Sequence, residues 1–268
     1  MTETGPFAHV GQQLAQMRAA APLVHNITNF VAMNVMANIE LAAGASPAML
    51  HALPEVAEFA ALCGALTVNI GTADADWAEG MVQAARVMHR LDRPWVLDPV
   101  GIGATQFRKD LCARLIALRP TVIRANASEI LALAGLGGQA HGVDARDTVA
   151  AAEVAARDLA GRTGGVVAVS GPIDYVTDGS HAFRIGNGHA LMPQVTALGC
   201  SLNGVIGAFL VGQKPLEATV AALAYYGLAG EIAAQTAQGP GSFAVAFLDA
   251  LANLTPEALS AGAKVSVA

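Results

Sequence analysis

Apolar runs alternate with amphipathic stretches through the middle of this 268-residue chain. Short continuous apolar runs that end in glycine or in polar residues predict buried strands. They lie at residues 66–72, 95–103, 121–129 and 164–171. Stretches with apolar residues at helical spacing predict helices at residues 28–43, 77–91, 108–118, 200–212, 216–237 and 242–254. We expect Thr28 to cap the first helix and Gly44 to end it.

The predicted strands show no alternation of polar residues, which indicates that both faces of their sheet are covered. Because strands and helices alternate, the sequence predicts an α/β fold with a mainly parallel central sheet and helices on both faces. Two short segments, residues 173–179 and 181–188, contain turn residues that predict a β-hairpin. With no linker or internal repeat, we expect a single domain over residues 1–268.

Composition excludes several classes of function. The net charge of -6 offers no basic surface to nucleic acid or to an anionic membrane. The apolar runs are too short to span a membrane and the first residues lack a secretory signal, so a soluble protein is expected. Three distant cysteines argue against a disulfide framework or a zinc site and suit the reducing cytoplasm. The 54% apolar content indicates that a partner subunit covers part of the surface.

Ligands of parallel sheets bind at the carboxyl ends of the strands, where this sequence has several polar residues. Asp98 ends one strand, where its carboxylate can hold Mg²⁺ or can form the turn before Pro99. Arg124 lies in an otherwise apolar strand, so a phosphate or carboxylate partner is expected. Ser170 can offer its hydroxyl to a nucleotide or belong to an ordinary turn.

Asn126 and Glu129 have the spacing of a helix start in which Asn126 is the N-cap and Glu129 completes a capping box. Capping alone explains both residues. If Asp98 lies on a neighbouring strand end, the two carboxylates instead predict a shared site for hydrated Mg²⁺, an arrangement typical of phosphoryl transfer.

The segment TALGCSLNGVIGAF, residues 196–209, turns through Gly199 and enters a helix near Cys200. The free N–H groups of that helix start are expected to face an anion and to lower the pKa of the Cys200 thiol. Cys200 is therefore a candidate proton acceptor for a substrate hydroxyl, although a lone cysteine also suits a small buried position. A cysteine nucleophile for acyl transfer would need a histidine, and only His25 lies in a suitable loop.

Near the amino end, His25 and Asn26 precede the first predicted helix, and the segment GASPAM that follows it ends at Met49. We expect these residues to form a pocket for a small, flat, partly apolar ligand, with Met49 adapting to its shape. Met33, Met36 and Met49 equally suit an ordinary apolar core.

Seven segments resemble the hydroxyethylthiazole kinase family and follow its order: VHNITNFVAMNVMAN, GASPAM, LTVNIGT, VLDPVGIGAT, IRANASEI, VVAVSGPIDYVTDG and GCSLNGVIGAF. The resemblance implies a ribokinase-like fold and a cytoplasmic enzyme of thiamine salvage. It implies that ATP, with Mg²⁺, phosphorylates the hydroxyl of 4-methyl-5-(2-hydroxyethyl)thiazole. It also implies a homotrimer with active sites between subunits.

The resemblance further implies roles for single residues. These are thiazole contacts by Met49, Gly199 and Asn26, ATP contacts by Arg124 and Ser170, Mg²⁺ organised by Asp98 and Glu129, and Cys200 at the position of the aspartate base of related sugar kinases.

The chain departs from the family just before the last site helix. The family usually reads TGTGC, whereas this chain reads TALGC over residues 196–200. Alanine at position 197 restricts positive φ and the close approach of backbone to phosphate that glycine allows. Leu198 removes a hydroxyl from the anion site. We therefore expect slower or rearranged phosphate handling.

Two other functions stay open at this point. One is a non-catalytic protein that binds thiazole or nucleotide on the same fold, and the TALGC departure is its only support. The other is a ribokinase-like kinase for another small alcohol, such as a hydroxymethylpyrimidine, against which the segments HNIT and GASPAM argue.

Overall fold

The computed structural model describes residues 10–135 and 147–268, and one sheet runs through both ranges. Within them its strands follow the order β2-β1-β3-β4-β5-β6-β7-β8-β9. Pairing is parallel from β2 to β6, and β7, β8 and β9 join antiparallel. The strands are β1 (Leu23–Ile27), β2 (Ser46–Ala48), β3 (Ala65–Asn69), β4 (Trp95–Asp98), β5 (Val122–Asn126), β6 (Val166–Ser170), β7 (Asp174–Thr177), β8 (Ala182–Ile185) and β9 (Val265–Val267).

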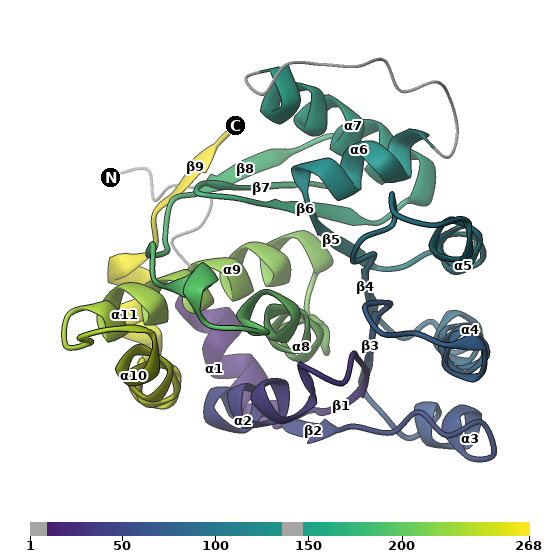
Figure 1. Cartoon of the computed structure of the whole chain (residues 1–268). Coiled ribbons are helices and arrows are strands. Elements are labelled where there is room, and N and C mark those ends of the chain that lie inside the picture. The colour runs from purple at the N-terminus through teal and green to yellow at the C-terminus, as the bar shows by residue number, and fades with distance from the viewer. Residues whose placement is uncertain (1–9, 136–146) are drawn as a thin grey trace.

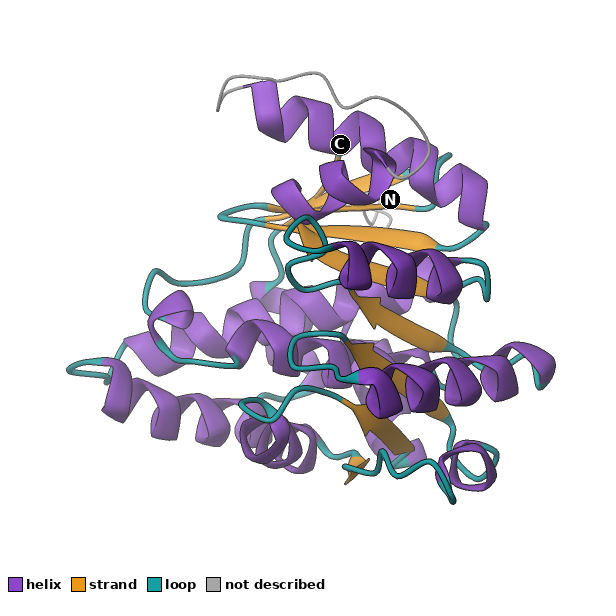
Figure 2. Ribbon diagram, turned by 45° about the vertical axis from the view of Figure 1, so that its right-hand side comes forward, coloured by secondary structure: helices purple, strands orange, loops and turns teal. Residues whose placement is uncertain are grey.

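Helices cover both faces of the sheet, as Figures 1 and 2 show. One layer holds α1 (Val10–Ala20), α2 (Met33–Ala43), α8 (Leu198–Leu210) and α9 (Pro215–Ala234), with α10 (Pro240–Asn253) and α11 (Pro256–Gly262) packed against them. The other holds α3 (Val56–Ala60), α4 (Ala75–Arg90), α5 (Gln106–Ile116), α6 (Ala127–Gly135) and α7 (Asp147–Thr163). In Figure 1 the sheet is seen nearly end-on, and β6 to β8 bend over α9.

Successive strand residues enter opposite cores, one under each helix layer. In β4, Val96 belongs to the core under α8 and α9, whereas Leu97 belongs to the core under α4 and α5. Val122 and Ile123 of β5 divide in the same way. Because both faces of each strand are buried, both must be apolar, which explains the continuous apolar runs in the sequence.

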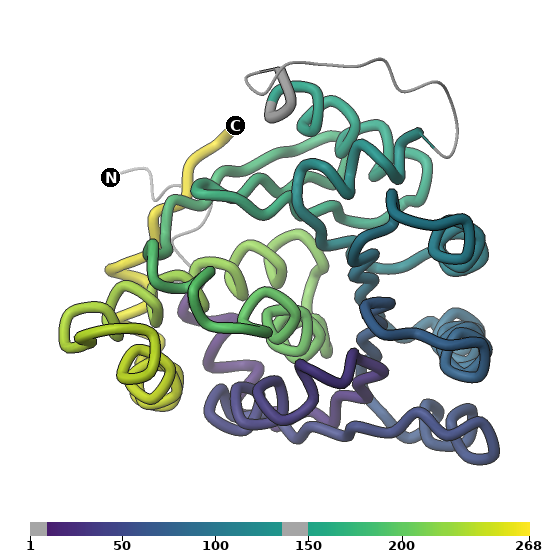
Figure 3. Tube along the Cα trace, in the orientation of Figure 1, coloured from purple at the N-terminus to yellow at the C-terminus, as the bar shows by residue number. Residues whose placement is uncertain are grey.

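The two ends of the described chain are tied together. Figure 3 shows α1, drawn in purple, beside α9, drawn in green. The Arg18 guanidinium of α1 donates hydrogen bonds of 2.8 Å to the carbonyls of Leu251 and Leu254. These contacts and the continuous sheet suit a single domain, which stays a prediction. Among the described residues, no helix has the length and apolar character needed to cross a membrane.

Each predicted helix and strand occurs, displaced by a few residues at its ends, and antiparallel pairing of β7 with β8 confirms the hairpin. The start of the first predicted helix was wrong, because residues 23–27 form β1 and α2 begins only at Met33. Thr28 does not cap it. Its turn is closed instead by Asn29, whose Oδ1 accepts the Ala32 N–H at 3.0 Å. The strands predicted at 95–103 and 121–129 end earlier, at Asp98 and Asn126.

Several elements had no counterpart in the sequence prediction. β1 was missed because His25 and Asn26 interrupt its apolar pattern, although both side chains are buried. β2, α3 and β9 are short, and short elements carry little periodic signal. α1, α7 and α11 were also missed.

Candidate active site

The carboxyl ends of the parallel strands meet at one edge of the sheet, where ligands of such folds bind. Asn69 at the end of β3 lies in register with Asp98 at the end of β4. Asn126 at the end of β5 lies in register with Ser170 at the end of β6. The expected clustering of these strand-end residues is therefore found.

Asp98 is a buried carboxylate held by two amides. Its side chain is 1% exposed, and its Oδ2 accepts hydrogen bonds from Asn69 Nδ2 at 2.6 Å and Asn203 Nδ2 at 2.7 Å. Its Oδ1 has no hydrogen-bond partner. Burial raises the pKa of Asp98 to about 7; the Arg124 guanidinium opposes the rise and the Glu129 carboxylate adds to it. Formation of the turn before Pro99 would not require the Asp98 side chain to be buried and hydrogen-bonded to two amides.

Glu129 has the predicted capping role and also reaches the loop after Asp98. The Asn126 N–H donates to Glu129 Oε2 and the Glu129 N–H donates to Asn126 Oδ1, each at 3.0 Å, which confirms the capping box. The other carboxylate oxygen, Oε1, accepts the Gly101 N–H at 3.0 Å. Because β4 pairs directly with β5, Asp98 and Glu129 lie at neighbouring strand ends, as a shared site requires.

Cys200 lies in the first turn of α8 and belongs to the same polar network. Asn29 Nδ2 donates to Cys200 Sγ at 3.4 Å and to Asn69 Oδ1 at 3.0 Å. Burial and the nearby Asp98 raise the pKa of the thiol, and hydrogen bonds from Asn29 and Asn69 lower it by less. The prediction of a lowered thiol pKa was therefore wrong, because the loss of solvent around Cys200 has the larger effect.

The N-cap of α8 is Ala197, which has φ 65° and ψ -3° and makes no capping hydrogen bond with its side chain. This is the left-handed region, which alanine enters only at a cost. The chain therefore adopts at Ala197 the conformation that a glycine would take without strain. The first N–H groups of α8 point out of the helix at the edge of the strand-end cluster.

Arg124, Ser170 and Gly199 line one cavity of about 600 Å³. Arg124 Nη1 donates to the Gly199 carbonyl at 3.0 Å, and Ser170 Oγ donates to the Ala125 carbonyl at 3.3 Å. The structure thus brings both predicted ATP contacts to the start of α8. The rest of the lining comes from the turn between β6 and β7, from β7, from the segment before α8, and from α8 and α9: Gly171, Pro172, Asp174, Asn187, Gly188, His189, Ala190, Met192, Pro193, Leu198, Leu202, Leu223, Tyr226 and Gly227.

Asn26 and Met49, the ligand contacts predicted near the amino end, lie in different surroundings. The Asn26 side chain is buried in the sheet, where its Oδ1 accepts from Thr67 Oγ1 at 2.6 Å and its Nδ2 donates to the Val24 carbonyl at 3.2 Å. Met49 follows β2 and is half-buried at the carboxyl edge of the sheet.

His25 lies on the other face of β1 from Asn26. Its Nε2 is 2.7 Å from the Leu50 carbonyl, its ring packs edge-on against Phe59, and burial lowers its pKa. Within the described residues no hydrogen bond or ring contact joins His25 to Cys200. The structure therefore gives no support to a cysteine nucleophile with a histidine base.

Four site residues were not identified from the sequence. Asn29, Asn69 and Asn203 make the amide contacts to Asp98 and Cys200. A signal was present for Asn69, at the end of a predicted strand, and for Asn203, nearly one helical turn after Cys200. The fourth, Arg108 of α5, donates to the carbonyls of Ile70, Gly71 and Val100 and so joins the loops after β3 and β4.

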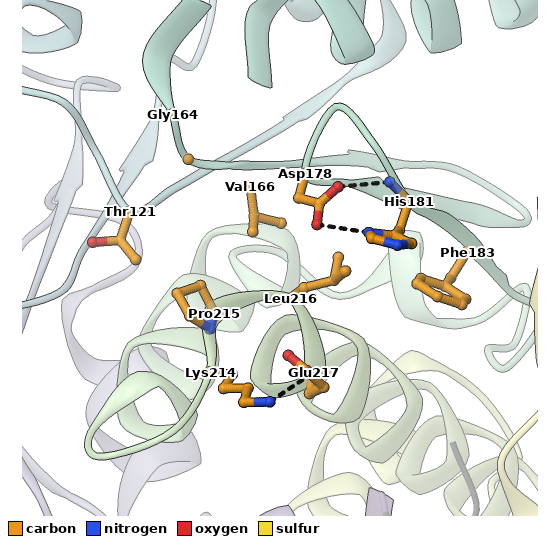
Figure 4. Close-up of a pocket in the computed structure, with 11 residues that line it drawn as sticks. Thr121, Gly164, Val166, Asp178, His181, Phe183, Lys214, Pro215, Leu216 and Glu217 are labelled. Atoms are coloured by element: carbon orange, nitrogen blue, oxygen red, sulfur yellow. Dashed lines mark hydrogen bonds and ion pairs between the residues drawn. The ribbon is translucent and has the colours of Figure 1, made fainter. Parts of the chain in front are cut away.

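A second cavity, of about 540 Å³, lies at the amino ends of β5 and β6 (Figure 4). Its polar groups already pair with one another: His181 binds Asp178, and Lys214 is 4.0 Å from Glu217. None of the sequence-predicted site residues lines it. The cavity at the carboxyl ends of the strands is therefore the candidate active site.

Comparison with known proteins identifies the family of this chain. The model of the hydroxyethylthiazole kinase family matches residues 14–257. A hydroxyethylthiazole kinase of Cereibacter sphaeroides (strain ATCC 17025 / ATH 2.4.3) is 63% identical over 258 residues, which cover 96% of this chain and 98% of the relative.

Solved structures confirm the fold. The hydroxyethylthiazole kinase protein from Pyrococcus horikoshii OT3 superposes with a TM-score of 0.89 at 39% identity, covering 97% of this chain and 98% of that one. A ribokinase-like superfamily protein from Enterococcus faecalis V583 gives a TM-score of 0.63 at 13% identity over 90% of this chain and 93% of that one, which shows a shared fold alone. The chain therefore belongs to the hydroxyethylthiazole kinase family and is a kinase with a ribokinase-like fold.

Proposed function

We propose that this kinase transfers the γ-phosphate of ATP, with Mg²⁺, to the hydroxyl of 4-methyl-5-(2-hydroxyethyl)thiazole in thiamine salvage. Family membership supports the acceptor. The observation that carries the chemistry is the single network joining the buried Asp98 carboxylate, Cys200 and the start of α8, at the edge of the cavity that Arg124 lines.

The residues at this edge fit a hydrated Mg²⁺ ion. Asp98 Oδ1 is buried without a hydrogen-bond partner, and Glu129 lies at the next strand end. Across residues 10–135 and 147–268, no group of three histidine, cysteine or acidic side chains gathers as a full protein cage. Mg²⁺ usually binds one or two carboxylates together with phosphate and water. Bound there, it would neutralise charge on the phosphates during transfer.

The protein residues position the reactants. Asn69 and Asn203 donate to one oxygen of Asp98, which leaves the other oxygen without a hydrogen-bond partner. The N–H groups at the start of α8 suit the transferring phosphoryl group, since a helix start attracts anions. Arg124 and Ser170 face the same cavity and suit the phosphates of ATP.

We assign the thiazole side of the site to Gly199 and Met49. Gly199 lines the cavity at the start of α8, and Met49 lies at the same edge of the sheet. Asn26 is proposed to belong to the thiazole side as well. Because its side chain is buried, it acts there through the backbone of β1 and β3, which it links by its hydrogen bond with Thr67.

Cys200 is proposed to act as a neutral thiol that contacts the acceptor hydroxyl. Its raised pKa leaves little thiolate at neutral pH, so a strong base at this position is not available. A loose transition state for phosphoryl transfer needs little help from a base. Orientation of the hydroxyl by the thiol and Asn29 is then the main contribution of this side chain.

We further propose a cytoplasmic homotrimer with active sites between subunits. Phe30 and Val31 are large exposed apolar residues that directly follow Asn29, the residue that contacts Cys200. A subunit covering them would stand next to the site. The three cysteines, all free, suit a reducing compartment.

The test is ADP release by purified protein with Mg·ATP, with and without the thiazole, and with Asp98→Asn as the control variant. We expect thiazole-dependent ADP release that falls at least about 100-fold in Asp98→Asn, since electrostatic groups of this kind contribute at that level. Thiazole binding without ADP release would instead support the non-catalytic protein. Faster ADP release with a hydroxymethylpyrimidine would support the other kinase.

A further inference from the structure

The first turn of α8 receives an unusual number of side-chain hydrogen bonds. Ser201 Oγ donates to the Ala197 carbonyl at 2.8 Å, in addition to the Ser201 N–H at 2.8 Å. Tyr226 Oη donates to the Leu198 carbonyl at 2.8 Å. Arg124 Nη1 and Asn203 Nδ2 donate to the next two carbonyls, each at 3.0 Å. Four consecutive carbonyls therefore accept side-chain hydrogen bonds, while the first N–H groups of the helix stay free for an anion.

Of these four donors, Tyr226 is the one that comes from another helix, α9. Ser201 and Asn203 belong to α8 itself, and Arg124 is a charged residue of β5. It is 3% exposed and its ring packs edge-on against Phe247 at 4.8 Å. Burial raises its pKa well above the usual value, so the hydroxyl keeps its proton and remains a donor. It also lines the cavity together with Leu198.

The turn that Tyr226 holds is strained. Ala197 has a left-handed backbone without a capping side-chain hydrogen bond. Such residues persist only where the surroundings over-determine their conformation. Two side chains from outside α8 donate to this turn, and Tyr226, which donates to the Leu198 carbonyl, binds next to Ala197 in sequence. The buried ring of Tyr226 fixes the direction of this hydrogen bond.

We propose that Tyr226 is a positioning residue for phosphoryl transfer: its hydroxyl holds the Leu198 carbonyl and thereby keeps the start of α8 open toward the transferred phosphate, against the strain at Ala197. The inference rests on the proposed function for the identity of the anion. Tyr226 acts through the backbone of α8 and need not touch either reactant.

The experiment measures kcat and KM for Tyr226→Phe in two backgrounds, wild type and Ala197→Gly. In the wild-type background kcat is expected to fall roughly tenfold, the effect of about one net hydrogen bond, with the thiazole KM changed less than about twofold. In the Ala197→Gly background the fall is expected to be less than about threefold, since glycine takes the left-handed conformation without strain. A purely stabilising role for the hydroxyl would not produce this dependence on residue 197.

Tyr225→Phe is the matched control. Tyr225 is the neighbouring residue of α9, is equally buried, and its hydroxyl donates to the Leu251 carbonyl at 2.5 Å, in α10 and away from the site. We expect it to keep wild-type kcat. If Tyr226→Phe also keeps wild-type kcat, or loses the same factor in both backgrounds, the positioning role is overturned.

Hydrogen exchange of the amides of residues 201–203, the first in α8 that donate within the helix, provides a readout that does not need turnover. We expect exchange there to be roughly tenfold faster in Tyr226→Phe than in Tyr225→Phe, again about one net hydrogen bond. Equal exchange in the two variants would overturn the inference even if the protein proved inactive on the thiazole. Absence of thiazole-dependent turnover in the wild type, with the exchange difference present, would refute the proposed function alone.

Discussion

Among the single residues at the start of α8, Ala197 has the least expected backbone conformation. The sequence alone indicated that alanine would restrict positive φ, yet the structure has φ 65° at this position. The chain keeps the glycine-like turn and accepts strain in the backbone.

Ala197→Gly is expected to raise the free energy of unfolding by up to about 1 kcal/mol, because the left-handed strain is removed at the cost of some unfolded-state entropy. It should also leave kcat equal to or above that of the wild type. Urea unfolding and the ADP assay measure the two quantities. Gly212→Ala, at a φ of +72° in a site far from α8's start, is the control and should be destabilising. A destabilised Ala197→Gly would show that residue 197 is not strained.

At the scale of elements, α8 determines where the site residues lie. Every residue from Ser201 to Leu210 is buried, because the helix packs between the sheet and the helices α2 and α9. Close approach depends on two glycines. A Cβ at Gly207 would lie 3.0 Å from Thr67 Cγ2, and one at Gly204 would lie 2.0 Å from Glu40 Oε1. The carboxyl of Glu40 thus occupies the space that a side chain at 204 would need.

Glu40 makes the α2–α8 contact sensitive to pH. Burial raises its pKa from 4.5 to about 8, against a smaller lowering by the Asn26 amide. The folded state therefore binds this proton more tightly than the unfolded state between those two values. Stability from this group is complete below about pH 4.5 and is lost as pH rises toward 8, by at most about 1.4 kcal/mol per pH unit.

Glu40→Gln is expected to match wild-type stability near pH 5 and to exceed it above pH 8, because glutamine stays neutral. Urea unfolding across this range measures the effect, with Glu58→Gln, an exposed carboxyl of α3, as the control. The same pH slope in wild type and Glu40→Gln would contradict the buried neutral acid.

At the scale of the whole molecule, the exposed apolar residues beside the site raise the question of assembly. Val31 is 58% exposed at the turn after β1, and Val154 is 70% exposed on α7 in the opposite layer. Both are valines of similar exposure, but only Val31 lies next to the strand-end cluster. A subunit contact at the site would therefore involve Val31 and not Val154.

Light scattering of the purified protein is expected to give three times the 27.2 kDa mass of one chain. Val31→Glu should lower that mass and reduce thiazole-dependent ADP release together, because a buried charge at an apolar interface is unfavourable. Val154→Glu should change neither. A monomeric wild-type protein with full activity would rule out sites between subunits.

The sequence by itself predicted the α/β class, the order of the middle elements, the β-hairpin and the family. These follow from local properties: buried strands need continuous apolar residues, and turns need glycine and polar residues in set places. Asp98, Glu129, Ser170 and Cys200 were proposed because they stand at strand ends or at a helix start, and Arg124 because it is a charged residue in an apolar strand. These features are visible along the chain.

Only the tertiary structure decided how these positions act on one another. The pKa of Cys200 depends on burial between elements distant in sequence, so a rule for helix starts predicted the wrong direction. Asn26 was expected to help form a ligand pocket before the first helix, but its side chain is buried in β1. Asn29, which was not singled out, reaches Cys200 across 171 positions of the chain. Local pattern determines which elements form, but burial and long-range contacts, which arise only when those elements pack, determine charge, strain and reactivity.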